Sequence, residues 1–194
     1  WEGEGGKPRE GAGVGPAREA GRRESGVVVP MNRRNKAAGR GQYIGEGGAK
    51  AAICSAELAR ELADANDALP AKEQLRRLVV TRYADAFDHD AGSDLPVPEE
   101  WRGWLHTGEL PVHGHAPVTP WVEALATTLP PPMLIGDPDT TCLLPYTSGT
   151  TGKPKGCVHH HGSIMHNAVA SWQWINGDPE SVMLAVLPLF HITG

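Results

Sequence analysis

Residues 146–156 read Tyr-Thr-Ser-Gly-Thr-Thr-Gly-Lys-Pro-Lys-Gly, and this stretch decides how the rest of the chain is interpreted. After the tyrosine it combines four hydroxyl side chains, three glycines and two lysines. Hydroxyl groups and the backbone N–H groups of glycine-rich turns donate hydrogen bonds to phosphate oxygens, and lysine supplies positive charge. The stretch therefore predicts a loop that binds a polyphosphate.

The spacing differs from that of the Walker-type loop, in which a glycine is followed by four residues and then Gly-Lys-Ser/Thr. Here Pro154 follows Gly152-Lys153, and Thr147 stands at the position of the first glycine. The kinase-type Gly-x-Gly-x-x-Gly is also absent. A flexible Ser/Thr/Gly linker is the structural alternative, but linkers do not usually place Lys-Pro-Lys-Gly between a buried strand and a capped helix. The pattern excludes a P-loop NTPase and a kinase.

Apolar runs alternate with helical patterns on both sides of the loop, which predicts an α/β fold with mainly parallel strands and crossover helices. Strands are predicted at residues 27–30, 51–54, 75–81, 141–145 and 181–187. Helices are predicted at residues 56–68, 121–129 and 163–175. Ser55 and Ser163 are the predicted N-caps of the first and last of these helices. Ile164, Ala168 and Trp172 or Ile175 should face the sheet.

Five glycines fall within residues 32–48, where a crossover helix is expected: Gly39, Gly41, Gly45, Gly47 and Gly48. Each interior glycine costs a helix about 0.5–1 kcal/mol relative to alanine. This helix is therefore predicted to be weak or broken. Residues 83–140 are rich in Pro, Asp, Gly and His and read mainly as surface connection, with loop histidines that are solvated by default.

Composition limits the function further. The formal net charge of -5 gives no basic field that would attract nucleic acid. The three scattered cysteines suggest a reducing compartment rather than a disulfide framework, which favours a cytoplasmic protein. No apolar run approaches the ~20 residues of a membrane span. Residues 1–26 are low in apolar side chains and predict a disordered tail, so that the ordered part would be residues 27–194.

A run of three histidines, His159-His160-His161, follows Cys157 closely and invites comparison with a zinc site. Adjacent residues do not easily converge on one tetrahedral ion, so metal binding by this run is disfavoured.

Residues 147–156 resemble the signature of the adenylate-forming enzymes, Ser/Thr-Ser-Gly-Ser/Thr-Thr-Gly-x-Pro-Lys-Gly, at every position. Residues 188–194 (PLFHITG) are similar to the family's Pro-x-Phe-His-x-x-Gly element, and residues 28–32 (VVPMN) to its upstream Val-Pro-x-Asn stretch. The order and spacing of the three motifs also fit the family. Residues 156–161 and the helix after them look closest to long-chain fatty-acyl-CoA ligases.

This resemblance implies that the chain is part of the large N-terminal domain of an acyl-CoA synthetase-like fold. It implies a two-step reaction, in which a carboxylate attacks the α-phosphate of ATP and a thiol, usually coenzyme A, then displaces AMP. ATP, Mg²⁺ and coenzyme A are the implied ligands, and a carboxylic acid, most readily a fatty acid, is the substrate. The implied ATP-binding residues are Thr147, Ser148, Gly149, Thr150, Thr151, Gly152, Lys153, Lys155 and Gly156.

Individual roles follow from the same resemblance. Lys155 would stabilise charge on the leaving pyrophosphate, and Thr151 would meet Mg²⁺ through ATP. Phe190, His191 and Gly194 would line the substrate pocket.

The family's later motifs do not occur before residue 194, among them the aromatic-Gly-x-Thr-Glu element and the lysine of a small C-terminal domain. The chain is therefore expected to be a fragment that is inactive alone. Two alternatives remain open: a nucleotide-binding remnant without catalysis, and an adenylation domain for another carboxylic acid. Peripheral membrane association of a full-length protein also stays open.

Overall fold

A computed structural model describes residues 26–32, 35, 37–86, 99–100, 103, 110, 114–127, 137–147, 154–182 and 184. The chain divides into two units. Unit 1 contains residues 1–17 and 33–130, and unit 2 contains residues 18–32 and 131–194. The predicted tail lies outside the described residues except for Gly26.

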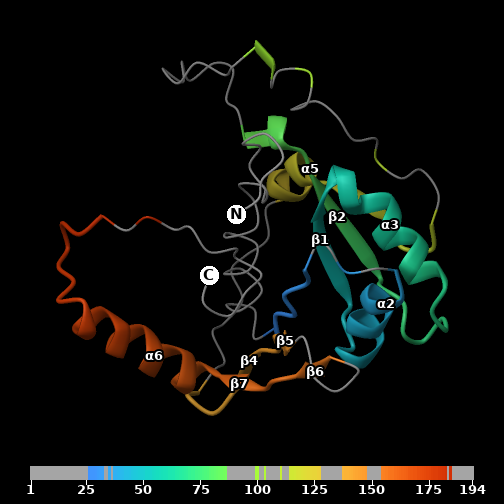
Figure 1. Cartoon of the computed structure of the whole chain (residues 1–194). Coiled ribbons are helices and arrows are strands. Elements are labelled where there is room, and N and C mark those ends of the chain that lie inside the picture. Colours follow the sequence, from blue (N-terminus) through green and yellow to red (C-terminus); the bar gives the residue numbers. More distant parts are fainter. Residues whose placement is uncertain are drawn as a thin grey trace. The chain divides into compact units, whose positions relative to one another are not determined.

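Unit 1 is built on a parallel sheet of three strands in the order β1-β2-β3 (Figure 1). The strands are β1 (Ala51–Ser55), β2 (Arg77–Thr81) and β3 (Val118–Pro120). The helices are α2 (Ala37–Glu46), α3 (Ala56–Asp67) and α5 (Trp121–Ala126), and a 3₁₀ turn, η1, covers Tyr83–Ala86. The predicted α/β class with parallel strands and crossover helices is confirmed.

The core of unit 1 forms where α3 packs on the sheet. Leu78 and Val80 of β2 are almost completely buried, as are Ala59 and Leu62 of α3. The buried face of α3 is mostly alanine, which lets the helix approach closely. Ser55 occupies the predicted N-cap position, although its side chain makes no capping hydrogen bond.

Helix α2 is continuous, so the prediction of a weak or broken helix is wrong. Tyr43 and Ile44 are buried, and Arg40 is buried in an ion pair with Glu61 of α3. Full burial of one large apolar side chain contributes about 1.5–3 kcal/mol, which outweighs the cost of an interior glycine. Helix α2 packs on α3, and a β-carbon at Gly41 would lie 3.5 Å from Cδ2 of Leu69.

Strand β3 is absent from the sequence-based prediction. It has only three residues, one of which is a proline. It forms through parallel pairing with β2, which is distant in the sequence (Leu78 with Val118, Val80 with Pro120). Helix α5 begins immediately afterwards, at the predicted Trp121, and ends at Ala126 rather than at residue 129.

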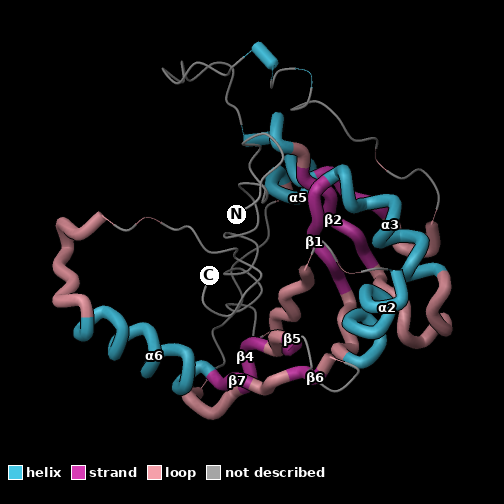
Figure 2. Tube along the Cα trace, in the orientation of Figure 1, coloured by secondary structure: helices cyan, strands magenta, loops and turns pink. Residues whose placement is uncertain are grey.

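The described part of unit 2 contains four short strands, which Figure 2 shows in magenta, and one long helix. The elements are β4 (Thr141–Leu143), β5 (Tyr146–Thr147), β6 (Lys155–Gly156), β7 (His159–His160) and α6 (His161–Trp174). The pairs β4–β7 and β5–β6 are antiparallel, which the mainly parallel prediction did not include. Strands of two or three residues are too short to produce an apolar period of their own.

The predicted strand at residues 27–30 is reduced to a single parallel bridge between Val28 and Leu143. Two backbone hydrogen bonds hold it, from Val28 N to the Cys142 carbonyl (3.0 Å) and from Leu144 N to the Val28 carbonyl (2.8 Å). Cys142 and Leu143 are fully buried and form the centre of unit 2.

Helix α6 begins at His161. This start is earlier than the one predicted with Ser163 as the N-cap. Ser163 is the third residue of the helix, where its hydroxyl accepts from His160 N (3.2 Å) and donates to the His160 carbonyl (2.8 Å). The predicted packing of Ala168 and of Trp172 or Ile175 on a sheet is also wrong, because all three are exposed, whereas Ile164 is half-buried. Within the described part of unit 2, the helix contacts mainly the two-residue strand β7, which is too small to cover it.

Asn176, just after helix α6, has a left-handed backbone with φ 51°. Ser181, Val182 and Leu184 were predicted to lie in a buried strand. They are exposed and belong to no strand, and the remaining residues of that segment lie outside the described part. No described element packs on Val182 or Leu184, so their apolar character alone does not bury them.

Candidate phosphate-binding loop

The structure describes both ends of the predicted phosphate loop. Thr147 is the last residue of β5, and Lys155 and Gly156 form β6. Six of the predicted ligands lie outside the described residues: Ser148, Gly149, Thr150, Thr151, Gly152 and Lys153. The predicted pocket residues Phe190, His191 and Gly194 also lie outside them.

Strands β5 and β6 pair with each other and bring the two ends of the loop together. Thr147 lies opposite Lys155, and Tyr146 lies opposite Gly156. Residues directly opposite each other in an antiparallel pair place their side chains on the same face. Thr147 and Lys155, eight positions apart in the sequence, thus present a hydroxyl and an ammonium group on one face of the pair.

The neighbouring elements hold this pair in position. The Cys157 N–H donates to the Pro145 carbonyl (2.8 Å), directly after the β5–β6 pair. Pairing of β4 with β7 then returns the chain to the start of α6, where His161 N donates to the Thr140 carbonyl (3.1 Å). Backbone hydrogen bonds therefore hold the chain in place next to both ends of the loop.

The charge around the loop favours an anion. From Thr140 to Gly177 the sequence contains no Asp or Glu, while Lys153 and Lys155 lie within this stretch. Lys155 is exposed. Within this stretch, no carboxylate opposes the binding of a polyphosphate next to Lys155. Because the stretch contains no carboxylate, the oxygens that it offers to Mg²⁺ are those of hydroxyl and carbonyl groups only. Such ligands fit an Mg²⁺ ion that arrives bound to ATP.

The histidine run shows no sign of convergence on a metal. Strand β7 contributes His159 and His160, and helix α6 starts with His161. Among the residues that the structure describes, no group of three His, Cys, Asp or Glu side chains has the geometry to hold a metal ion.

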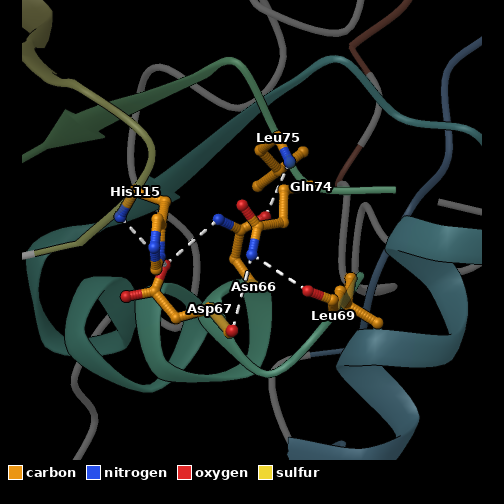
Figure 3. A network of polar contacts seen from close by, with 6 residues as sticks. All are labelled: Asn66, Asp67, Leu69, Gln74, Leu75 and His115. Atoms are coloured by element: carbon orange, nitrogen blue, oxygen red, sulfur yellow. Dashed lines mark hydrogen bonds and ion pairs between the residues drawn. The ribbon is translucent and has the colours of Figure 1, made fainter. Parts of the chain in front are cut away.

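A second polar cluster, in unit 1, was not predicted (Figure 3). Asp67, at the end of α3, accepts from the His115 backbone N–H (3.0 Å) and forms an ion pair with the His115 ring (3.1 Å). The backbone hydrogen bond from His115 is the main cause that lowers the pKa of the Asp67 carboxyl. His115, expected to be a solvated loop histidine, is thus largely exposed but partnered.

Asn66 lies next to Asp67 and is fully buried, and its Oδ1 accepts from the Leu75 N–H at 2.6 Å (Figure 3). The cluster joins α3 to the segments that lead into β2 and β3. It shares no residue with the loop of unit 2, so we assign it a structural role. Its partners are separated by up to 48 positions along the chain, which leaves no local signal in the sequence.

The three cysteines, Cys54, Cys142 and Cys157, are thiols and form no disulfide. Burial raises the pKa of the Cys54 thiol to about 12, with a smaller contribution from the nearby Glu57 carboxylate. A thiol of that pKa is a poor nucleophile at neutral pH. In the described ranges, no helix has the length and apolar character needed to cross a membrane.

Unit 1 is a parallel α/β unit, and in unit 2 two short strands pair at the ends of the Ser/Thr/Gly/Lys stretch, ahead of a helix. Comparison with protein families matches residues 21–194 to the AMP-binding enzymes. The chain belongs to this family.

The chain is also similar to individual acid–CoA ligases. It is 37% identical over 105 residues to the sulfoacetate–CoA ligase of Cupriavidus necator, an alignment that covers 54% of this chain and 18% of the relative. It is 39% identical over 84 residues to the mitochondrial malonate–CoA ligase of Mus musculus, covering 40% of this chain and 14% of the relative.

Among solved structures, the adenylation domain of a carboxylate reductase from Mycobacterium chelonae matches with a TM-score of 0.56 and 25% identity. That match covers 90% of this chain and 26% of the solved chain. The chain thus spans about a quarter of this structural relative, and less than a fifth of the two ligases.

Proposed function

We propose that this chain supplies the phosphate-binding part of an AMP-forming acid–thiol ligase. The observation that carries the proposal is the β5–β6 pair, which sets Lys155 beside Thr147 at the ends of the signature loop. Family membership and the acid-free stretch from Thr140 to Gly177 support the same conclusion.

In the proposed reaction, a carboxylate oxygen of the substrate attacks the α-phosphorus of ATP, and pyrophosphate leaves with the electron pair of the broken P–O bond. Negative charge grows on the pyrophosphate, so fixed donors and cations around it lower the barrier. Lys155 would supply positive charge, and the loop hydroxyls and glycine N–H groups would donate hydrogen bonds. Bound Mg²⁺ would neutralise further phosphate charge, with Thr151 as the nearest proposed protein contact.

In the second half-reaction, the thiol of coenzyme A attacks the acyl-adenylate and AMP leaves. Phe190, His191 and Gly194 are the residues that we propose for the acyl pocket. We propose a fatty acid as the substrate. The named relatives act on other acids, such as sulfoacetate and malonate, so an adenylation domain for another acid is the alternative.

The three thiols and the net charge of -5 support a cytoplasmic protein that acts on small molecules rather than on nucleic acid.

The test has two steps. Titration of the chain with Mg²⁺–ATP by calorimetry should show one site, and Lys155→Ala should weaken binding about tenfold, a typical loss for a charge-assisted contact. ATP–pyrophosphate exchange with fatty acids, malonate and sulfoacetate then separates the hypotheses. Exchange with fatty acids supports the proposed substrate, and exchange only with another acid supports the alternative. Binding without exchange fits either the nucleotide-binding remnant or the expected inactive fragment, whereas absence of binding contradicts the proposal.

A further inference from the structure

The ends of the signature loop are held by an unusually short ladder. Strands β5 and β6 have two residues each, and residues 148–154 connect them. An isolated pair of strands is marginally stable even when it is longer. Specific side-chain contacts must therefore decide whether the ends of the loop stay together.

One such contact lies on the face of the ladder that carries Tyr146 and Gly156. A β-carbon built on Gly156 would lie 3.1 Å from Cδ1 of Leu144 and 3.3 Å from Cζ of Tyr146. Both distances are tighter than ordinary van der Waals contact. The side chains of Leu144 and Tyr146 thus lie over Gly156, an arrangement in which an aromatic ring covers a glycine on the opposite strand.

The other contact lies on the opposite face. The Thr147 hydroxyl donates to the Lys155 carbonyl across the ladder, at a long 3.4 Å. A hydroxyl group has only one proton to donate. A hydroxyl that donates to Lys155 is not also available to donate to a phosphate oxygen.

We infer that Gly156 and Thr147 are positioning residues. They hold together the β5–β6 pair, here called the neck of the loop, so that Lys155 points to the bound phosphates. The inference rests on the proposed function and changes the role of two residues within it. Gly156 is a glycine because Leu144 and Tyr146 occupy the space of a side chain, and not because phosphate approaches its backbone. Thr147 likewise holds the neck together, whereas the other hydroxyl residues of the loop are proposed to bind phosphate.

The experiment uses the complete chain and two measurements. Hydrogen–deuterium exchange of the peptide that covers residues 154–160, without nucleotide, reports the closure of the neck. Calorimetric titration with Mg²⁺–ATP reports binding. Exchange of β1 and β2, in unit 1, is the internal control for folding.

Gly156→Ala should speed exchange at the neck and weaken Mg²⁺–ATP binding about tenfold each, the size of effect expected when an added methyl group forces its neighbours to move. Leu144→Ala removes two of the three atoms nearest to the new methyl group. The double variant Gly156→Ala with Leu144→Ala should therefore recover most of both losses. If phosphate contacted Gly156 directly, the methyl group would still block it in the double variant. Absence of rescue would therefore overturn the inference.

Thr147 is tested by a matched pair of variants. Thr147→Val has the same shape without the hydroxyl and should speed exchange at the neck in the absence of nucleotide, whereas Thr147→Ser should not. Weaker Mg²⁺–ATP binding by Thr147→Val with unchanged neck exchange would identify a phosphate ligand and contradict the inference. If the unaltered chain binds no Mg²⁺–ATP, the proposed function fails. The exchange data then still decide whether Gly156 and Thr147 close the neck.

Discussion

At the scale of single residues, Asn66 shows how one buried amide organises a connection. Its Oδ1 satisfies the Leu75 N–H, which precedes β2, and the side chain has no exposed surface. A buried backbone donor that loses its partner costs about 1–3 kcal/mol. The sequence gives Asn66 no distinguishing mark, because its role depends on the return of the chain nine positions later.

Asn66→Ala should accordingly lower the free energy of unfolding by about 1–3 kcal/mol. Urea unfolding followed by circular dichroism measures the loss. Asn167→Ala, at an exposed position of α6, is the matched control and should cause no loss. Equal stability of the two variants would show that the Leu75 N–H is satisfied in another way.

Cys54 provides a second prediction at this scale. Because burial raises its pKa to about 12, very little thiolate exists near neutral pH. We expect iodoacetamide to modify Cys54 at pH 8 far more slowly than it modifies a small free thiol such as glutathione. Peptide mass spectrometry over a time course gives the rate. Labelling of Cys54 as fast as the small thiol would contradict its description as an unreactive thiol.

At the scale of elements, α2 demonstrates where sequence patterns fail. Glycine content alone predicts a broken helix, but burial of Tyr43 and Ile44 and the pairing of Arg40 with α3 maintain it. The longer strands β1 and β2 and the helix α3 follow from their local patterns. Strand β3 and the strands of unit 2 do not, because two or three residues acquire strand geometry only through their partners. Around the loop, the signature predicts the ligands, but only the structure shows that Thr147 pairs with Lys155 and Tyr146 with Gly156.

Helix α2 should gain stability when an open glycine is replaced. Among the described residues, a β-carbon at Gly39 meets Asn35 alone, at 3.7 Å, so Gly39→Ala should raise the free energy of unfolding by about 0.5–1 kcal/mol. Gly48, just after the helix, has φ +60°, where a side chain is strained by about 1–2 kcal/mol. Gly48→Ala should therefore destabilise. Urea unfolding of both variants shows whether each substitution raises or lowers the free energy of unfolding. A loss of stability in Gly39→Ala would show that α2 tolerates no side chain there.

At the scale of the whole molecule, the parallel sheet belongs to unit 1 and the candidate site to unit 2. The Asp67–His115 contact stabilises unit 1, so its pH dependence should be separable from nucleotide binding. The pKa of Asp67 is lower in the folded chain than its ordinary value of 3.8. Its contribution to stability is therefore complete above about pH 4 and decreases as the pH falls towards the folded pKa.

Asp67→Asn should accordingly be less stable than the unaltered chain at pH 7, and the difference should shrink as the pH falls below about 4. Urea unfolding at several pH values measures it. Asp64→Asn, at an exposed position of the same helix, is the control. A difference for Asp67→Asn that stayed constant with pH would exclude this carboxylate as the cause.

Nucleotide binding by the signature loop is the central claim, and glycine-selective ¹⁵N labelling tests it most directly. The chain has 24 glycines, distributed over both units. On addition of Mg²⁺–ATP, the amide signals of Gly149 and Gly152 should shift, whereas those of Gly39, Gly41 and Gly45 should remain in place. Lys155→Ala should reduce the loop shifts at the same nucleotide concentration. Unchanged loop signals, or shifts confined to the glycines of α2, would contradict the account.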